Sequence, residues 1–158
     1  MVRLWLIKHL VSREELEDAW RAIRSTPLSS SCPSLQDFFC LAESTSFFRY
    51  ERRGVPLGFF WAFPDSDACW KFGACALPHA PTPYLEDIRR VIRFLLVHTR
   101  AAVLVAEVRR MKSDRIGRIL LHFHFYQAGC IPRYYGRESM VIFYRLSNTD
   151  DGDIETLS

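Results

Sequence analysis

Several side chains in this sequence could accept a proton during a reaction. Glu107 follows the apolar run at residues 101–106. The other candidates are two acids in a short polar stretch and one histidine after an aromatic segment: Asp65, Asp67 and His79. Carboxylate and imidazole groups can act as general bases, directly or through one water. The same residues also fit ordinary structural roles, such as turn acids, a loop histidine and an ion pair of Glu107 with Arg109 at a strand end.

The histidines and cysteines do not form a metal-binding pattern. His122 and His124 are two residues apart in a predicted helix, whereas ligands on one helical face need a spacing of three or four. No Cys-x-x-Cys pair occurs among the five cysteines, which are Cys32, Cys40, Cys69, Cys75 and Cys130. We expect free, mostly buried thiols of a reducing compartment. Cys75 near His79 lacks the third member that an activated nucleophile needs, so we predict no metal site and no thiol enzyme.

The positive charge of the chain is unevenly placed. The tail after Thr149 holds four of the 18 acidic residues, which leaves residues 1–149 with a net charge of +7, against +3 for the whole chain. The basic run from Arg109 to Arg118 could meet phosphate groups or form a solvated helix entry. A charge of this size favours an anionic ligand but is small for a nucleic-acid surface. We therefore expect no nucleic-acid partner.

Length and composition indicate one soluble globular domain. The 158 residues are 49% hydrophobic and 25% charged, and 14% aromatic residues predict a bulky core. No apolar stretch approaches the roughly 20 residues that span a bilayer, and the N-terminus lacks a signal-peptide pattern. We expect a folded domain at residues 1–147, an acidic disordered tail at residues 148–158, and a cytoplasmic location.

Hydrophobic periodicity and capping signals place the helices and strands. Strands are predicted at residues 2–10, 46–50, 55–63, 68–77, 101–106, 131–137 and 139–146. Helices are predicted after the capping box Ser12–Glu15, after Ser34, at residues 85–99, and from Ser113 to a stop at Gly129. Gly54 fits the hairpin position that needs a positive φ, and Gly73 indicates a bulge or a close backbone approach. The fold class is α/β, a mixed sheet with helices on both faces in the order β-α-α-β-β-β-α-β-α-β-β.

This order resembles the GNAT N-acetyltransferase fold over nearly the whole chain. Glu51-Arg-Arg-Gly-Val-Pro-Leu-Gly58 looks like the family's second hairpin, with its E-x-x-G-x-x-x-G spacing. Ala106-Glu-Val-Arg109 looks like the end of its fifth strand. Phe125-Tyr-Gln-Ala-Gly-Cys130 is similar to the F-Y-x-x-x-G-F ending of its last helix, with a difference of one residue in spacing. The chain is also similar to small GNAT-like proteins of tailed phages.

The resemblance implies transfer of an acetyl group from acetyl-CoA to a small-molecule or peptide amine. It places the pantetheine arm along residues 72–77 and the pyrophosphate at the loop that follows. The residues implied for the cofactor are Gly73, Ala74, Cys75, Ala76, Leu77, Thr82, Tyr84 and Leu85, the last two through their backbone N–H groups. Tyr126 matches the family's tyrosine that protonates the departing thiolate, a role suited to a weakly acidic phenol. Glu107 is our first choice for the base.

The loop at residues 77–84 departs from the family's Gly-rich Q/R-x-x-G-x-G/A pattern. It has no glycine, and its prolines have no N–H to donate to phosphate. Glu86 and Asp87 follow in the first helical turn, where they would repel phosphate. The alternative is therefore a non-catalytic GNAT-like protein with a binding or assembly role. It would engage a protein partner or a second copy, and it would be virion-associated if it is phage-encoded.

Overall fold

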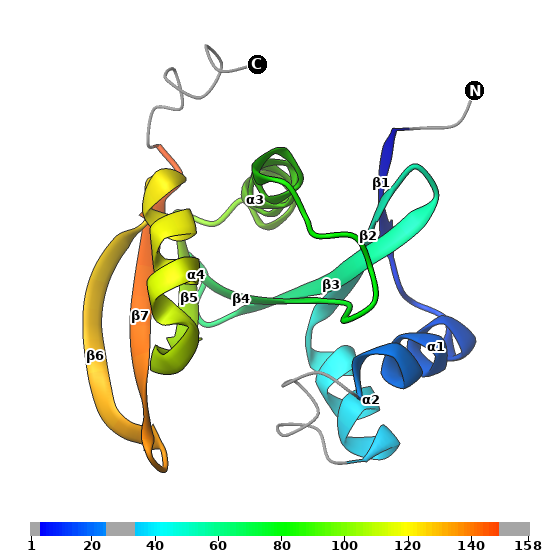
Figure 1. Cartoon of the computed structure of the whole chain (residues 1–158), viewed down its shortest axis with the longest axis horizontal. Coiled ribbons are helices and arrows are strands. Elements are labelled where there is room, and N and C mark those ends of the chain that lie inside the picture. The colour runs from blue at the N-terminus through cyan, green and yellow to red at the C-terminus, as the bar shows by residue number, and fades with distance from the viewer. Residues whose placement is uncertain (1–3, 25–33, 149–158) are drawn as a thin grey trace. The chain divides into compact units, whose positions relative to one another are not determined.

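The computed structural model describes residues 4–24 and 34–148 (Figure 1). Its strands are β1 (Trp5–His9), β2 (Ser46–Arg52), β3 (Val55–Pro64), β4 (Cys69–Ala76), β5 (Val103–Arg109), β6 (Tyr126–Tyr135) and β7 (Glu138–Leu146). Its helices are α1 (Arg13–Ile23), α2 (Leu35–Ser44), α3 (Leu85–Thr99) and α4 (Arg110–His122). These elements follow the predicted order. Cys32 and the acidic residues after 148 lie outside the described residues.

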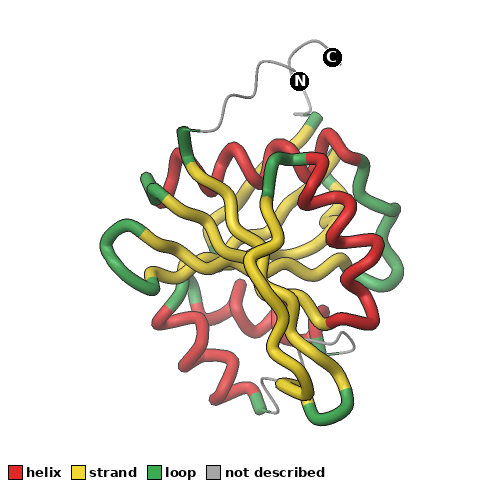
Figure 2. Tube along the Cα trace, turned by 90° about the vertical axis from the view of Figure 1, so that its left-hand side faces the viewer, coloured by secondary structure: helices red, strands yellow, loops and turns green. Residues whose placement is uncertain are grey.

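The strands form a seven-stranded sheet in the order β1-β2-β3-β4-β5-β7-β6, which confirms the α/β class (Figure 2). The pairs β1/β2, β2/β3, β5/β7 and β6/β7 are antiparallel. By contacts the chain divides into two compact units. The first unit contains Met1–Pro64 and Phe72–Leu95, and the second contains Asp65–Lys71 and Leu96–Ser158. We describe each unit by itself; β4 and α3 contribute residues to both.

Helices cover both faces of the sheet in the first unit. Phe47 of β2 packs edge-on against Phe38 of α2, with ring centroids 5.2 Å apart. Its neighbour Phe48 packs against Phe94 of α3 at 4.9 Å. Because successive side chains of a strand point to opposite faces, α2 and α3 lie on opposite sides of β2. The expectation of helices on both faces is thus confirmed for this unit.

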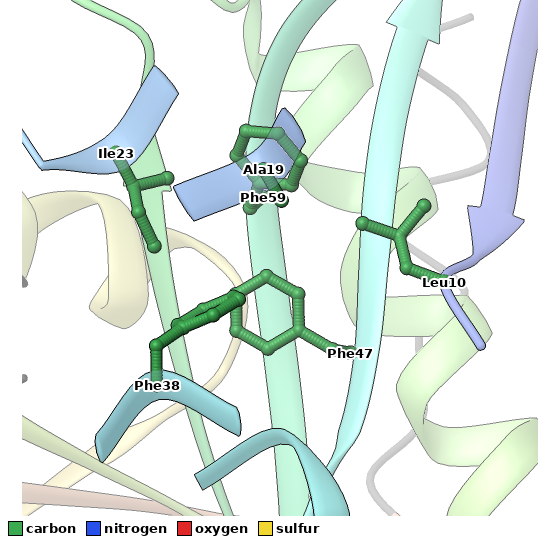
Figure 3. Close-up of a cluster of buried hydrophobic side chains, with 6 residues drawn as sticks. All are labelled: Leu10, Ala19, Ile23, Phe38, Phe47 and Phe59. Atoms are coloured by element: carbon green, nitrogen blue, oxygen red, sulfur yellow. The ribbon is translucent and has the colours of Figure 1, made fainter. Parts of the chain in front are cut away.

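A cluster of buried apolar side chains joins α1 and α2 to the sheet (Figure 3). Its members are Leu10, Ala19, Ile23, Phe38, Phe47 and Phe59. Phe38 has no exposed surface, and Trp20 of α1 packs on it with ring centroids 5.7 Å apart. Burying one such side chain contributes about 1.5–3 kcal/mol. The aromatic residues that the composition emphasised therefore build the core of this unit.

The hairpin between β2 and β3 has the predicted turn. Arg53 and Gly54 have φ values of 52° and 77°, so both adopt the left-handed conformation that a two-residue type I′ turn requires. Gly54 adopts this conformation without the steric cost that a Cβ brings. The N–H of Arg53 also donates to Leu4 O at 2.9 Å, which ties the turn to the segment before β1.

In the second unit, α4 packs on β5 and β7. A Cβ added to Gly117 of α4 would lie 3.1 Å from Cζ of Phe143. The glycine therefore lets the helix approach the strand closely. Leu104 and Ala106 of β5, which are 0% and 6% exposed, complete the apolar layer. This agrees with the continuous apolar run that the sequence contains there.

The last helix is shorter than predicted and begins earlier. It starts at Arg110 with Arg109 as its N-cap, so Ser113 lies inside the helix and does not cap it. It ends at His122, and Gly129 belongs to β6. The prediction of a stop at Gly129 was therefore wrong.

A Schellman motif with a histidine at its left-handed position ends α4. His124 has a φ of 64°, and its N–H donates to Leu121 O at 3.1 Å. The N–H of Phe125 donates to Leu120 O at 3.0 Å, which is the second bond of the motif. Arg145, 2% exposed, donates to Phe123 O at 2.7 Å and places a cation at the negative end of the helix. Glycine is the usual residue at this position, so the sequence did not indicate the stop.

The capping box at the start of α1 is confirmed. The N–H of Glu15 donates to Ser12 Oγ at 3.2 Å, and the N–H of Ser12 donates to the Glu15 carboxylate at 3.4 Å. Lys8 of β1 also contacts this carboxylate, with Nζ 2.5 Å from Oε1. This hydrogen bond is the main cause that lowers the pKa of Glu15 to about 2. One carboxylate thus caps the helix and links it to the first strand.

We expect Glu15→Gln to lower the free energy of unfolding by about 1 kcal/mol at pH 7. Because the folded-state pKa of Glu15 is depressed, its contribution is fully present above the ordinary value of 4.5 and is lost as the pH falls toward 2. Urea unfolding at pH 7 and near pH 2 measures this difference. Glu14→Gln in the same turn is the control and should cost less than about 0.5 kcal/mol. An equal loss for both variants would contradict the assignment.

Candidate functional site

Gly73 of β4 is covered by a tryptophan. A Cβ built on Gly73 would lie 2.4 Å from Cζ2 of Trp61. Trp61 in turn stacks on Phe47, with ring centroids 5.6 Å apart and planes 5° apart. The close neighbour of Gly73 is therefore a side chain, and not the backbone whose close approach the sequence predicted. The space beside this glycine is occupied by the indole, so Gly73 does not leave the room for a pantetheine arm that we expected.

We expect Gly73→Ala to destabilise the fold by about 1–3 kcal/mol, because the stacked indole has little freedom to move. In a Trp61→Leu background the same substitution should cost much less, since the ring it would meet is gone. Chemical denaturation of the four members of this double-mutant cycle measures the coupling. Equal costs in both backgrounds would show that Trp61 is not the obstacle.

The other residues predicted along β4 divide between two faces. Cys75 and Leu77 pack against the apolar cluster of Figure 3 and serve the core. Ala74 and Ala76 alternate with them and are exposed. Within residues 72–77, where the pantetheine arm was predicted to lie, only Ala74 and Ala76 are both small and exposed to solvent.

The loop after β4 is open to solvent along most of its length. His79 and Thr82 are exposed, and Tyr84 and Leu85 are 65% and 50% exposed. The N–H of Tyr84, which we predicted as a phosphate donor, already donates to Asp87 Oδ2 at 2.8 Å. One of the two backbone donors predicted at this helix start therefore has an acceptor within the chain.

Asp87 is a buried carboxylate in the first turn of α3. It is 2% exposed and accepts hydrogen bonds from Tyr50 Oη at 2.5 Å and Arg52 Nη1 at 2.5 Å, both on β2. Arg90 approaches the same carboxylate at 3.7 Å. Burial, followed by the hydrogen bond to Asp87, raises the pKa of Tyr50 to about 12. The phenol therefore stays protonated and keeps donating to the carboxylate at neutral pH.

The two arginines beside Asp87 also lie on aromatic rings. The guanidinium of Arg52 is 4.0 Å from the ring centroid of Tyr84, and that of Arg90 is 5.3 Å from that of Trp5. Such cation–π contacts fix the planes of both guanidiniums. The sequence placed Asp87 in the first helical turn but carried no sign of its partners on β2, which lie more than thirty positions earlier in the chain.

Glu107 of β5 forms an ion pair with Lys71 of β4. The Nζ of Lys71 is 2.8 Å from Oε1 of Glu107 and 4.0 Å from Oδ1 of Asp65. The hydrogen bond with Glu107 is the main cause that raises the pKa of Lys71. Both side chains of this pair are about 30% exposed, so the carboxylate can be reached from solvent. Lys71 was not among the residues selected from sequence, because only the tertiary structure brings it to Glu107.

Cys69 lies near the same pair. Burial, and then the charge of Asp65, raise the pKa of its thiol. The thiol form, which is a poorer nucleophile than the thiolate, is therefore favoured at Cys69. The described cysteines are free thiols, as expected, but none of them is fully buried: Cys40 and Cys130 are exposed, and Cys69 and Cys75 are partly buried. The expectation of mostly buried thiols was therefore wrong for the described cysteines.

Tyr126 is not part of the last helix. It is the first residue of β6, 52% exposed, and its ring lies 5.6 Å from that of Tyr144 on β7. The prediction that placed it at the helix end was wrong. If the F-Y-x-x-x-G-F pattern is aligned to the observed helix end, His124 takes the place of the glycine. Leu120, which is 6% exposed, then takes that of the tyrosine.

Two further expectations concern metals and membranes. The described residues contain no group of three or more His, Cys, Asp or Glu side chains that could hold a metal ion. Among the helices in the described part of the chain, none is both long and apolar enough to cross a bilayer.

Solved structures similar to this chain include N-acetyltransferases. One is PseH of Campylobacter jejuni in complex with acetyl coenzyme A, with a TM-score of 0.63 and 16% identity over 89% of this chain and 99% of that one. Another is spermidine N-acetyltransferase of Vibrio cholerae with CoA and spermine, with a TM-score of 0.74 and 12% identity over 91% and 96%. A putative acetyltransferase of the GNAT family from Desulfovibrio desulfuricans matches with a TM-score of 0.70 and 14% identity over 90% and 99%.

No protein-family model matches this sequence, and no curated protein does. The structural matches, all at low identity, establish that the chain has the fold of the GNAT N-acetyltransferases.

Proposed function

We propose that this chain transfers the acetyl group of acetyl-CoA to the amine of a small molecule or peptide. The observation that carries the proposal is the match of about nine tenths of the chain to acetyltransferases solved with acetyl-CoA or CoA. In this reaction the amine nitrogen attacks the thioester carbonyl, the C–S bond breaks, and the amide and free CoA are the products.

The residues of this chain fit the pantetheine end of acetyl-CoA better than they fit its pyrophosphate. Ala74 and Ala76 of β4 are small and exposed, as a strand beside a pantetheine arm requires. At the start of α3, by contrast, the Tyr84 N–H is bound by Asp87 and the loop prolines have no N–H. The proposal therefore uses β4 for the thioester end and derives no phosphate contact from the start of α3.

Glu107 is the proposed base. An amine must lose a proton to attack a carbonyl, and a solvent-accessible carboxylate can accept it directly or through water. Lys71 holds the carboxylate at 2.8 Å and fixes its orientation. That Tyr126 protonates the departing thiolate stays a prediction. It now rests only on the weak acidity of a phenol, because Tyr126 lies in β6 and not at the end of the last helix.

A second candidate is a GNAT-like protein that binds a partner without catalysis, in the cell or in a phage particle. It is favoured by one specific observation: Leu120, an apolar side chain, stands where the family pattern has its tyrosine. This candidate predicts no CoA binding and no transfer.

Calorimetric titration with acetyl-CoA, alongside CoA without its acyl group, tests the proposal. We expect a Kd in the micromolar range, about −8 kcal/mol, for acetyl-CoA. A panel of amines with detection of released thiol then identifies the acceptor. If neither ligand binds at millimolar concentration, the transferase proposal is wrong and the binding candidate takes its place.

A further inference from the structure

In the second unit, Glu107 lies on the face of the sheet opposite α4. Phe143 of β7 lies against Gly117 of α4 and is the strand partner of Ala106. Because successive side chains of a strand alternate between faces, Glu107 and its own partner Ile142 point to the other side. The proposed base is therefore on a face of β5 and β7 that α4 does not cover.

One row of paired residues leads from Glu107 across this face to β6, the last strand in the sheet order. Glu107 is opposite Ile142 of β7, and Ile142 is opposite Gly129 of β6. A Cβ added to Gly129 would meet no atom within 4 Å, so the space at this end of the row is open. Neighbouring strands lie about 4.8 Å apart, which places the Cα atoms of Glu107 and Gly129 about 10 Å from each other.

The adjacent row on the same face is apolar and aromatic. Tyr144 of β7 is opposite Val105 of β5 and Tyr126 of β6. The two tyrosine rings lie 5.6 Å apart, and Tyr126 is 52% exposed. No residue of this row carries a charge at neutral pH. We call the following residues the uncharged face: Val105, Tyr126, Gly129, Ile142 and Tyr144.

The acids beside the uncharged face can balance one ammonium group. Glu107 and Asp65 share the cation Lys71, whose Nζ is 2.8 and 4.0 Å from their carboxylates, so these three groups have a net charge of −1. The next acid on this face of β7 is Glu138, four residues from Ile142 and thus about 13 Å along the strand. A small diamine bound at Glu107 does not reach it.

An amine that presents its nitrogen to Glu107 and extends toward β6 places the rest of the molecule on the uncharged face. A second ammonium group would lose part of its hydration there without meeting a counter-ion. An apolar body gains contact with Ile142 and with the two tyrosine rings. The charges and the apolar surface therefore favour the same kind of molecule.

We propose that the uncharged face binds the body of the acceptor, and that the acceptor is an amine with a single positive charge and an apolar body. Diamines and polyamines are accordingly poor substrates. This inference rests on the proposed transferase function, because it names the substrate class of that reaction.

The test compares n-pentylamine with 1,4-diaminobutane in the acetyl-transfer assay. The two molecules have the same number of non-hydrogen atoms and differ in one terminal group, which is a methyl in the first and an ammonium in the second. We expect kcat/KM to be at least about five-fold higher for n-pentylamine. A smaller ratio, or one that favours the diamine, overturns the proposal.

Gly129→Asp provides a second test, because it adds a carboxylate to the open end of the row. It should shift the preference toward 1,4-diaminobutane and lower the ratio of kcat/KM values at least about three-fold. Gln127→Glu is the matched control: it adds the same charge to the same strand, but Gln127 is exposed and pairs with Phe143 on the opposite face. The control should keep the ratio within about two-fold of the original. No shift in Gly129→Asp, or an equal shift in both variants, contradicts the proposal. The comparison in the unsubstituted chain holds even if a variant does not fold.

Binding of the two amines without acetyl-CoA separates this inference from the transferase proposal. Saturation-transfer NMR of the unsubstituted chain should detect n-pentylamine and give a weaker signal for 1,4-diaminobutane. If acetyl-CoA does not bind but this preference is seen, the transfer reaction is wrong and the binding surface stands. If the chain transfers acetyl groups and prefers the diamine, the reaction stands and this inference is wrong. The inference also fails if neither amine binds and neither is acetylated.

Discussion

Replacing Asp87 by alanine is expected to lower the free energy of unfolding by about 3–5 kcal/mol. The carboxylate is 2% exposed and balances the guanidinium of Arg52, which is itself mostly buried. Its removal leaves that charge, and the Tyr50 hydroxyl, without their acceptor in a poorly solvated place. Urea unfolding followed by tryptophan fluorescence measures the loss.

Asp18→Ala is the matched control for this prediction. Asp18 also pairs with an arginine, Arg21, but both side chains are at least 60% exposed. An exposed pair of this kind contributes at most about 1 kcal/mol, so the control should unfold nearly as the original chain does. A loss below about 1 kcal/mol for Asp87→Ala would mean that water replaces the carboxylate at little cost, in conflict with its burial.

Glu107→Gln is expected to lower kcat/KM for acetyl transfer by about 100-fold or more, if Glu107 is the base. The amide keeps the size of the side chain and a hydrogen-bonding oxygen for Lys71, but it cannot accept the proton of the amine. Release of the CoA thiol in the presence of the acceptor measures the rate. Unfolding in urea, run in parallel, shows whether a lower rate reflects lost stability.

The control for Glu107 is Glu138→Gln at the start of β7, which removes one carboxylate from the same unit. It should leave the rate within about two-fold of the original. If Glu107→Gln also retains its rate, the pair with Lys71 is structural. The base must then be sought among Asp65, Asp67 and His79.

The end of α4 illustrates where sequence patterns were insufficient. Gly129 carries the ordinary signal for a helix stop, but the left-handed residue that ends the helix is His124, earlier in the chain. The stop depends on buried contacts, because Leu120 and Phe125, the two residues joined by the closing bond of the motif, are 6% and 1% exposed. Their burial favours ending the helix there despite the steric cost of a left-handed histidine.

Local interactions explain what the sequence by itself determined. The capping box at Ser12, the helix at residues 85–99 and the hairpin turn at Gly54 each depend on residues within a few positions of one another. Their signals can therefore be recognised in the sequence, and together their order predicted the fold class. That Ala74 and Ala76 share one face of β4 could also be predicted from the sequence, because the alternation of side chains along a strand is a local property.

Only the tertiary structure decided which side chains meet across elements. It brought Trp61 over Gly73, Lys71 to Glu107, and Tyr50 to Asp87 across 37 positions of sequence. It also placed Tyr126 on a strand by ending α4 early. The physical reason is that these contacts depend on strand pairing and helix docking, whose partners come from separate elements and leave no periodic or capping signal in the chain.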